Sequence, residues 1–131
     1  MRHEQSSLST RIDELTGSSA FLLCLADAAS AHFTVGQAAF FMLAAVANAK
    51  GKPLTLTQLL EAHGEGMTTA VKNSYKVLLP ASRTHPKGLG WLHRVPNAND
   101  EREKFLVLTD TGHAVIRMAL LALAPPAKAN A

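Results

Sequence analysis

Apolar residues recur every three or four positions along the first part of the chain, which is the spacing of one face of a helix. Leu8, Ile12 and Leu15 keep this spacing up to the stretch Gly17-Ser18-Ser19. That stretch is compatible with a kink in one helix or with a break at which Ser18 caps a second helix. The apolar stripe then resumes at Leu22, Leu25, Ala26 and Ala29.

A capping box opens the most apolar segment of the chain. The side chains of Thr34 and Gln37 are spaced to bond each other's backbone amides at a helix start. This helix should run to about Lys50, before Gly51-Lys52-Pro53 stops it. Because the segment is apolar on all sides, it predicts the central buried helix.

Two further helices are predicted between residues 55 and 79. A second capping box, at Thr55 and Gln58, starts a short helix that ends at His63-Gly64. The next should begin near Met67 and end at Leu79, because Pro80 disfavours helical geometry before it. The expected inward positions are Met67, Val71, Ser74 or Tyr75, and Leu78. The expected outward positions are Thr68, Thr69, Lys72, Asn73 and Lys76. Two short helices joined by a tight turn, the second one basic outside, are typical of a helix-turn-helix.

The last third of the chain changes to a strand pattern. Trp91 to Val95 and Lys104 to Leu108 favour β structure, and the polar loop between them predicts a β-hairpin. Thr109 followed by Asp110 is a good helix start. This closing helix should reach about Ala124, before Pro125-Pro126. Its apolar residues predict a dimerisation surface that one domain does not cover: Val115, Met118, Leu121 and Leu123.

Composition narrows the class of protein. The 131 residues, 47% of them hydrophobic, suit one domain with its own core, and residues 1–7 and 125–131 are expected to be disordered. The single Cys24 lies in an apolar run and cannot form an internal disulfide, so we expect a buried thiol and a reducing compartment. No apolar run reaches the length of a membrane span, which predicts a soluble cytoplasmic protein without a membrane partner. A formal net charge of +3 permits an anionic partner.

In register behind the helix-turn-helix pattern, two short motifs resemble the MarR family of transcription regulators. They are Gly90-Trp91-Leu92-x-Arg94 and Asp100-x-Arg102 followed by Leu108-Thr109-x-x-Gly112. The resemblance covers roughly residues 34 to 112. It implies a winged helix-turn-helix, mainly helical with a two-stranded hairpin wing and flanking dimerisation helices. It also implies a homodimer on pseudo-palindromic double-stranded DNA, with recognition helices in major grooves and wings over minor grooves.

The chain departs from that family in two places. The segment between Leu78 and Gly90 is longer than the family's short turn, and its polar part, Ser82 to Gly88, is either a solvated insertion or a source of phosphate contacts. The family commonly dimerises through an N-terminal and two C-terminal helices, whereas this chain has one C-terminal helix. The smaller dimer surface leaves open whether a small-molecule effector binds.

Different basic residues suit different parts of a duplex. The outward positions Thr68, Thr69, Lys72, Asn73 and Lys76 suit a major groove, where Asn reads adenine and Lys reaches guanine or phosphate. Arg102 suits a narrow minor groove, with Asp100 orienting its guanidinium. Arg94 and Lys104 flank the wing and can reach phosphates. The alternatives are a solvated polar face and, for Arg102, a plain surface ion pair.

Catalytic chemistry finds little support. The six histidines form no pair of ligands at metal spacing, and the chain carries no phosphate-binding glycine loop and no nucleophile elbow. We therefore expect no enzyme, cofactor or metal, and a sequence-specific regulator, most simply a repressor. Two alternatives remain open: a plasmid or phage replication or partition protein on the same fold, and a winged helix that binds another protein.

Overall fold

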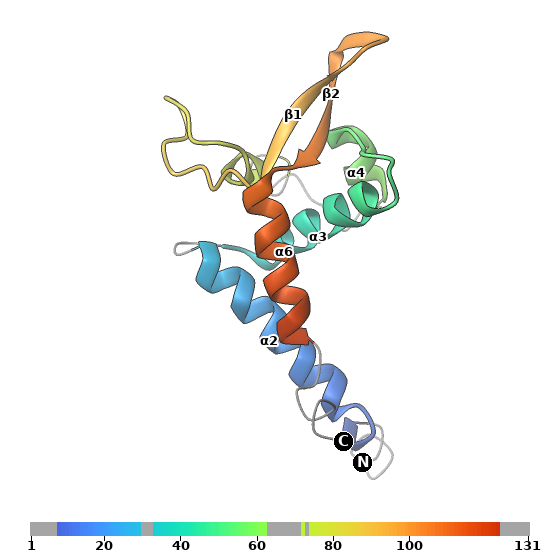
Figure 1. Ribbon diagram of the computed structural model, residues 1–131, viewed down its shortest axis with the longest axis vertical. Helices are drawn as coiled ribbons and strands as arrows, with labels where there is room; N and C mark the ends of the chain where they lie inside the picture. The colour runs from blue at the N-terminus through green and yellow to red at the C-terminus, as the bar shows by residue number, and fades with distance from the viewer. Residues whose placement is uncertain (1–7, 30–32, 63–71, 73, 124–131) are drawn as a thin grey trace.

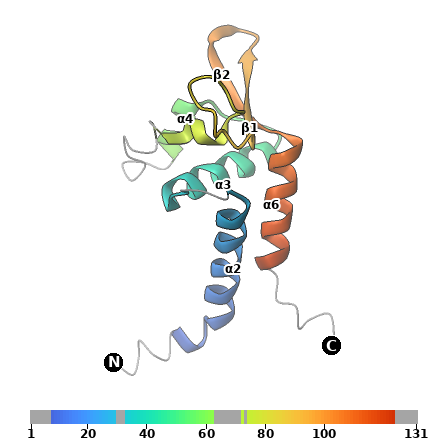
Figure 2. The ribbon, with the colours of Figure 1, turned by 90° about the vertical axis from the view of Figure 1, so that its left-hand side faces the viewer.

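A computed structural model describes residues 8–29, 33–62, 72 and 74–123 (Figure 1). This part of the chain is mainly helical and carries one two-stranded antiparallel hairpin. The hairpin projects from one end of the molecule, while α2 and α6 lie side by side and extend the other way in both ribbon views (Figures 1 and 2). In chain order the elements are α2 Ile12–Ala29, α3 Val35–Ala49, α4 Leu56–Ala62, the 3-10 helix η2 Tyr75–Leu78, β1 Leu92–Asn97, β2 Asp100–Leu108 and α6 Asp110–Leu123.

Helix α2 runs unbroken through Gly17-Ser18-Ser19, so the break expected as one of two alternatives does not occur. Gly17 lies in a close approach to α6, where a Cβ built on it would lie 2.7 Å from the carbonyl oxygen of Leu123. The buried row of α2 keeps a spacing of four residues, which leaves Leu22 and Ala26 of the expected stripe exposed. That row consists of Gly17, Phe21, Leu25 and Ala29.

Helix α3 is the central buried helix, as the sequence predicts. Its capping box is complete: the Gln37 amide donates to Thr34 Oγ1 at 3.0 Å, and the Thr34 amide donates to Gln37 Oε1 at 2.9 Å. Phe40 and Phe41 are fully buried. The ring of Trp91, which follows the long loop, packs on Phe41 with centroids 4.9 Å apart. The core therefore joins α3 to the base of the hairpin.

The second capping box also forms, with the Gln58 amide 3.2 Å from Thr55 Oγ1 and the Thr55 amide 3.0 Å from Gln58 Oε1. The expected end of this helix at His63-Gly64 and the start of the next near Met67 lie outside the described residues. What is described of the second helix ends as predicted, in a 3-10 turn followed by extended backbone at Leu79. Of its expected inward positions Tyr75 and Leu78 are buried, and Ser74 is half-buried. Met67 and Val71 lie outside the described residues.

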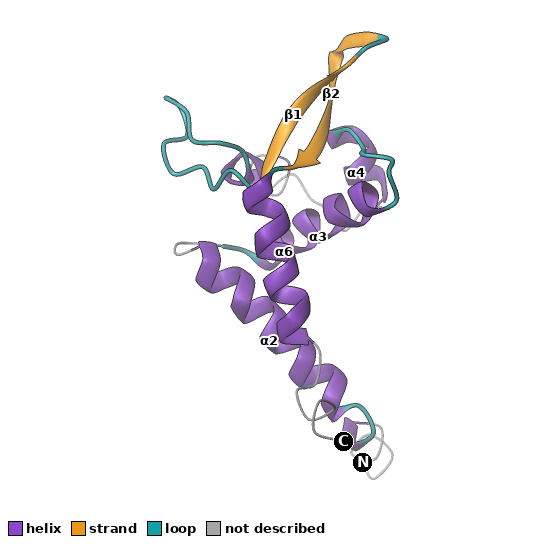
Figure 3. Ribbon diagram, in the orientation of Figure 1, coloured by secondary structure: helices purple, strands orange, loops and turns teal. Residues whose placement is uncertain are grey.

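The hairpin forms where predicted, with longer strands (Figure 3). Its register runs evenly from Leu92 opposite Leu108 to Pro96 opposite Lys104, and then shifts so that Asn97 pairs with Asp100. The shift leaves residues 101 to 103 of β2 as an irregular bulge beside the tip. An isolated bridge between Thr55 and Phe105 ties the start of α4 to the hairpin.

Two polar side chains join the hairpin to the helices. In α3, Asn48 Oδ1 accepts a hydrogen bond from the Leu108 amide at 3.1 Å, and Asn48 Nδ2 donates one to the carbonyl of Leu106 at 3.1 Å. Thr109 caps α6, because its Oγ1 accepts from the Gly112 amide at 3.0 Å and donates to the carbonyl of Gly90. These contacts fix the direction in which the hairpin leaves the helical body.

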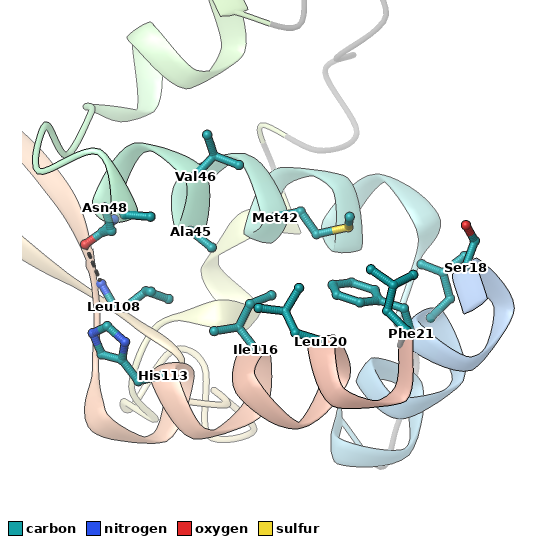
Figure 4. A pocket seen from close by; sticks show the side chains of 13 residues that line it. Ser18, Phe21, Met42, Ala45, Val46, Asn48, Leu108, His113, Ile116 and Leu120 are labelled. Carbon is teal, nitrogen blue, oxygen red and sulfur yellow. Dashed lines mark hydrogen bonds between the residues drawn. The ribbon is translucent and has the colours of Figure 1, made fainter. Parts of the chain in front are cut away.

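Large apolar side chains remain exposed on α2 and α6. An apolar cavity of about 570 Å³ opens between α2, α3 and α6, with Phe21, Met42 and Ile116 in its wall (Figure 4). Val115 packs against the core, whereas the sequence placed it on an uncovered surface. Cys24, expected to be buried, is partly buried against the core. The exposed set is Ile12, Leu15, Leu22 and Leu23 on α2, and Met118, Leu120, Leu121 and Leu123 on α6.

Candidate nucleic-acid interface

The structure describes two of the five residues predicted for the outward face of the second helix. Lys72 is helical and exposed, and Lys76 is exposed in η2, while Tyr75 and Leu78 turn into the core. Thr68, Thr69 and Asn73 lie outside the described residues. The burial of Lys72 and of residues 74 to 78 therefore agrees with the expected division into a basic outer face and an apolar inner face.

Arg94 joins the hairpin to this helix. Its Nη2 donates to the hydroxyl of Tyr75 at 2.9 Å, and its guanidinium carbon lies 5.9 Å from the centre of the Tyr75 ring. The ring is itself packed against Phe40, with centroids 5.9 Å apart. An exposed cation of β1 is thus anchored to a buried aromatic of η2. Sequence reasoning missed this pairing; its signal was a tyrosine at an inward helix position, because a buried hydroxyl requires a partner.

Arg102 lies near the tip of the hairpin, and its side chain is 93% exposed. Asp100 Oδ1 accepts from the Arg102 backbone amide at 3.1 Å, and the Arg102 Nε atom lies 3.5 Å from the same oxygen. The expected contact between Asp100 and Arg102 is present, and the shorter of its two distances is the one to the Arg102 backbone amide. An ion pair this exposed contributes little to stability, so the guanidinium is available for another anion.

The three basic residues expected on the hairpin converge on one side of it. Arg94, Arg102 and Lys104 all line a hollow of about 270 Å³ between the hairpin and the start of α4. Thr55 and Thr57 supply hydroxyls to the same hollow, and Glu103 supplies its carboxylate. The structure therefore brings together, beside α4, residues that the sequence placed only at the tip and on the two flanks of the hairpin.

A second hollow, of about 380 Å³, lies on the other side of Arg94. Its polar lining comes from η2, from the long loop and from β1: Lys76, Ser82, Thr84, His85, His93 and Arg94. Ser82, Thr84 and His85 belong to the polar loop for which the sequence left phosphate contacts open as one of two alternatives. Of these six residues His93 was not considered, and its available signal was its place next to Arg94 in a strand.

Neither hollow resembles a metal centre. Among the described residues, no group of three or more His, Cys, Asp or Glu side chains is placed to hold a metal ion. No described helix is long and apolar enough to cross a membrane. What the hollows share is cationic and hydrogen-bond-donating side chains, which is the chemistry that binds phosphate oxygens.

Removing the Tyr75 hydroxyl should loosen Arg94 without unfolding the protein. Tyr75→Phe keeps the buried ring and removes one hydrogen bond, so we expect a stability loss of about 1 kcal/mol or less. Because Arg94 would then have to be ordered on binding, affinity for the double-stranded DNA that the sequence predicts as a partner should fall roughly threefold to tenfold. Titration of labelled duplex with Tyr75→Phe, Arg94→Ala and the double variant measures the coupling. Additive losses would show that the two residues act independently.

A scan against protein-family models found no match to this chain, and searches of curated proteins and of solved structures found none either.

Proposed function

We propose that the chain is a winged helix-turn-helix protein that binds double-stranded DNA at specific sites and regulates transcription, as a repressor in the simplest case. The observation that carries the proposal is the anchoring of Arg94 on Tyr75. Through it the cations of the hairpin sit beside the helix that exposes Lys72 and Lys76. A basic helix next to a basic hairpin is the arrangement that reads a major groove and an adjoining minor groove.

Each element has a distinct task in this proposal. The helix that contains Lys72 enters the major groove, where its lysines meet guanine acceptors or phosphates. Arg102 enters the minor groove from the irregular end of β2, and Asp100 holds the backbone that presents it. Arg94 and Lys104 meet phosphates between the two grooves. The MarR family, which the sequence resembles at Gly90 to Arg94 and at Asp100 to Gly112, works in this way.

The proposed DNA-binding unit is a homodimer. Leu23 on α2 is 68% exposed and Leu121 on α6 is 71% exposed, and both helices project away from the hairpin (Figure 1). Exposed apolar surface of this extent on adjacent helices marks an interaction site. A second copy that packs its α2 and α6 on this surface also supplies the two-fold symmetry that an inverted repeat requires.

Light scattering at micromolar concentration should give the mass of a dimer. Leu121→Glu should shift the protein towards monomer, because a charge buried in an apolar interface is costly. Thr111→Glu is the matched control, since it adds the same charge to the first turn of the same helix, where the dipole favours it. A wild-type monomer would remove the dimer from the proposal.

Arg102→Ala should weaken binding most on sites with A·T-rich flanks. The negative potential of a narrow minor groove attracts an inserted guanidinium, and G·C-rich flanks weaken that attraction. Titration of wild type and variant against duplexes that differ only in the flanks measures the difference. The melting temperature should not change, because the side chain is 93% exposed. Unchanged affinity on every duplex would mean that the hairpin does not touch DNA.

The direct experiment is selection of bound sequences from a random duplex pool. We expect enrichment of an inverted repeat whose half-sites lie about one helical turn, or about 10 base pairs, apart. A pool without an enriched motif would exclude a sequence-specific regulator. Mapping of occupied sites in the genome would then separate a regulator, which sits at promoters, from a replication or partition protein, which sits at an origin or partition site.

A further inference from the structure

The long loop between η2 and β1 is fixed by contacts between its own backbone segments. Residues 80 and 89 form an isolated antiparallel bridge, and the Leu89 amide donates to the carbonyl of Val77 at 2.7 Å. At Gly88 a Cβ would lie 2.3 Å from the carbonyl oxygen of Leu79, so the two arms of the loop run in close contact. The loop lies beside the base of the hairpin in both ribbon views (Figures 2 and 3).

The loop's inner turn presents two hydroxyls in fixed positions. The Ser82 amide donates to the carbonyl of His85 at 2.9 Å, and the His85 amide donates to Ser82 Oγ at 3.2 Å. The Thr84 hydroxyl lies 3.2 Å from His85 Nδ1 and 3.4 Å from Ser82 Oγ. Reciprocal bonds of this kind fix a short turn before any ligand arrives, which lowers the entropic cost of binding.

The hollow behind this turn carries cations and donors but no acid. Lys76 and Arg94 bring full positive charges, and His85 and His93 bring imidazole nitrogens. None of its lining residues is Asp or Glu, whereas the hollow on the other side of Arg94 includes Glu103. Lysine and arginine only donate hydrogen bonds, and serine, threonine and histidine can either donate or accept them. Such side chains around a space of about 380 Å³ fit an anion with several acceptor oxygens.

We propose that this hollow binds one phosphate group of the DNA backbone, and that the segment from Pro80 to Leu89 is a phosphate clamp. This inference rests on the proposed function. The clamp lies between Lys76 at the end of the helix and Arg94 at the start of the hairpin. A duplex that touches both elements brings its backbone past the gap between them. Ser82, Thr84, His85 and His93 then fix the register of the protein on the duplex.

The test is a scan of the selected operator with single methylphosphonate substitutions, which remove the charge of one phosphate at a time. With wild-type protein, substitution of one phosphate per half-site, the one that the clamp binds, should lower the affinity for the operator about tenfold. With His85→Ala/His93→Ala, the unmodified operator should bind about tenfold more weakly, and the same methylphosphonate should cost clearly less than it costs wild type, because only Lys76, Arg94 and the hydroxyls still meet that phosphate. His93→Gln, which keeps a polar side chain of similar size in β1, should give the same pattern with a smaller loss.

Arg83→Ala is the matched control. Arg83 is a cation of the same loop that does not line the hollow, so its variant should keep the wild-type pattern of sensitive positions. The clamp is overturned if both histidine variants keep the wild-type sensitivity at every position while wild type still prefers the operator over a shuffled duplex. If wild type shows no such preference, the proposed function fails as well, and the two failures are thereby distinguished.

Discussion

Reversing the charge of Lys72 and Lys76 together should weaken binding to the selected operator by about 100-fold or more. Both side chains are exposed on the helix whose Tyr75 and Leu78 lie in the core. If each lysine meets a base acceptor or a phosphate, the double Glu variant loses two attractive contacts and gains two repulsive ones. Fluorescence anisotropy with labelled duplex measures the loss, and the melting temperature should stay close to that of wild type.

The control must separate position from total charge. Lys50→Glu/Lys52→Glu lowers the net charge by the same amount at two exposed residues between α3 and α4. Neither residue lines one of the two hollows or belongs to the proposed dimer surface on α2 and α6. This control should weaken binding only slightly. Equal losses in the two double variants would mean that net charge, rather than the helix face, drives association.

Gly112→Ala should destabilise the fold by about 2 kcal/mol or more. A Cβ at this position would lie 2.0 Å from the carbonyl oxygen of Trp91 and 2.9 Å from its carbonyl carbon. Both atoms belong to the backbone, so no side-chain rotation relieves the clash. The first turn of α6 would have to move away from the hairpin, which outweighs the better helix propensity of alanine, about 1 kcal/mol.

Urea unfolding followed by the fluorescence of Trp91, the single tryptophan, measures this effect directly. Thr111→Ala is the matched control, because it makes an exposed substitution in the same turn and should change stability by about 0.5 kcal/mol or less. A Gly112→Ala variant as stable as wild type would show that the junction of α6 and the hairpin is looser than described. It would also remove the structural reason for the glycine of the motif Leu108-Thr109-x-x-Gly112.

The elements that follow local rules were predictable from the sequence. Thr34 with Gln37, and Thr55 with Gln58, form the two capping boxes that their spacing indicates. Thr109 caps α6 for the same reason, and the β-favouring runs on either side of the polar loop located the hairpin. Each of these features depends on residues within a few positions of one another, so a single sequence contains the information.

Features that depend on distant segments were not predictable. Gly17 leaves room for the close approach of Leu123, more than 100 positions away, and the register shift in the hairpin moves residues 101 to 103 away from simple alternation. The bond between Arg94 and Tyr75 joins residues 19 positions apart. The proposed clamp requires the end of η2, the loop and β1 to meet around one hollow, and no local pattern encodes such a meeting. The sequence could therefore propose the basic residues but not how they are grouped.

The measurement that tests the central claim most directly is an anisotropy titration of wild-type protein with the selected inverted repeat and with a shuffled duplex, at two salt concentrations. The account predicts a complex of two chains per duplex, at least about 1,000-fold tighter binding to the inverted repeat, and weaker binding to both duplexes at higher salt. Equal affinity for the two duplexes, or affinity that salt does not change, would contradict sequence-specific DNA binding by this protein.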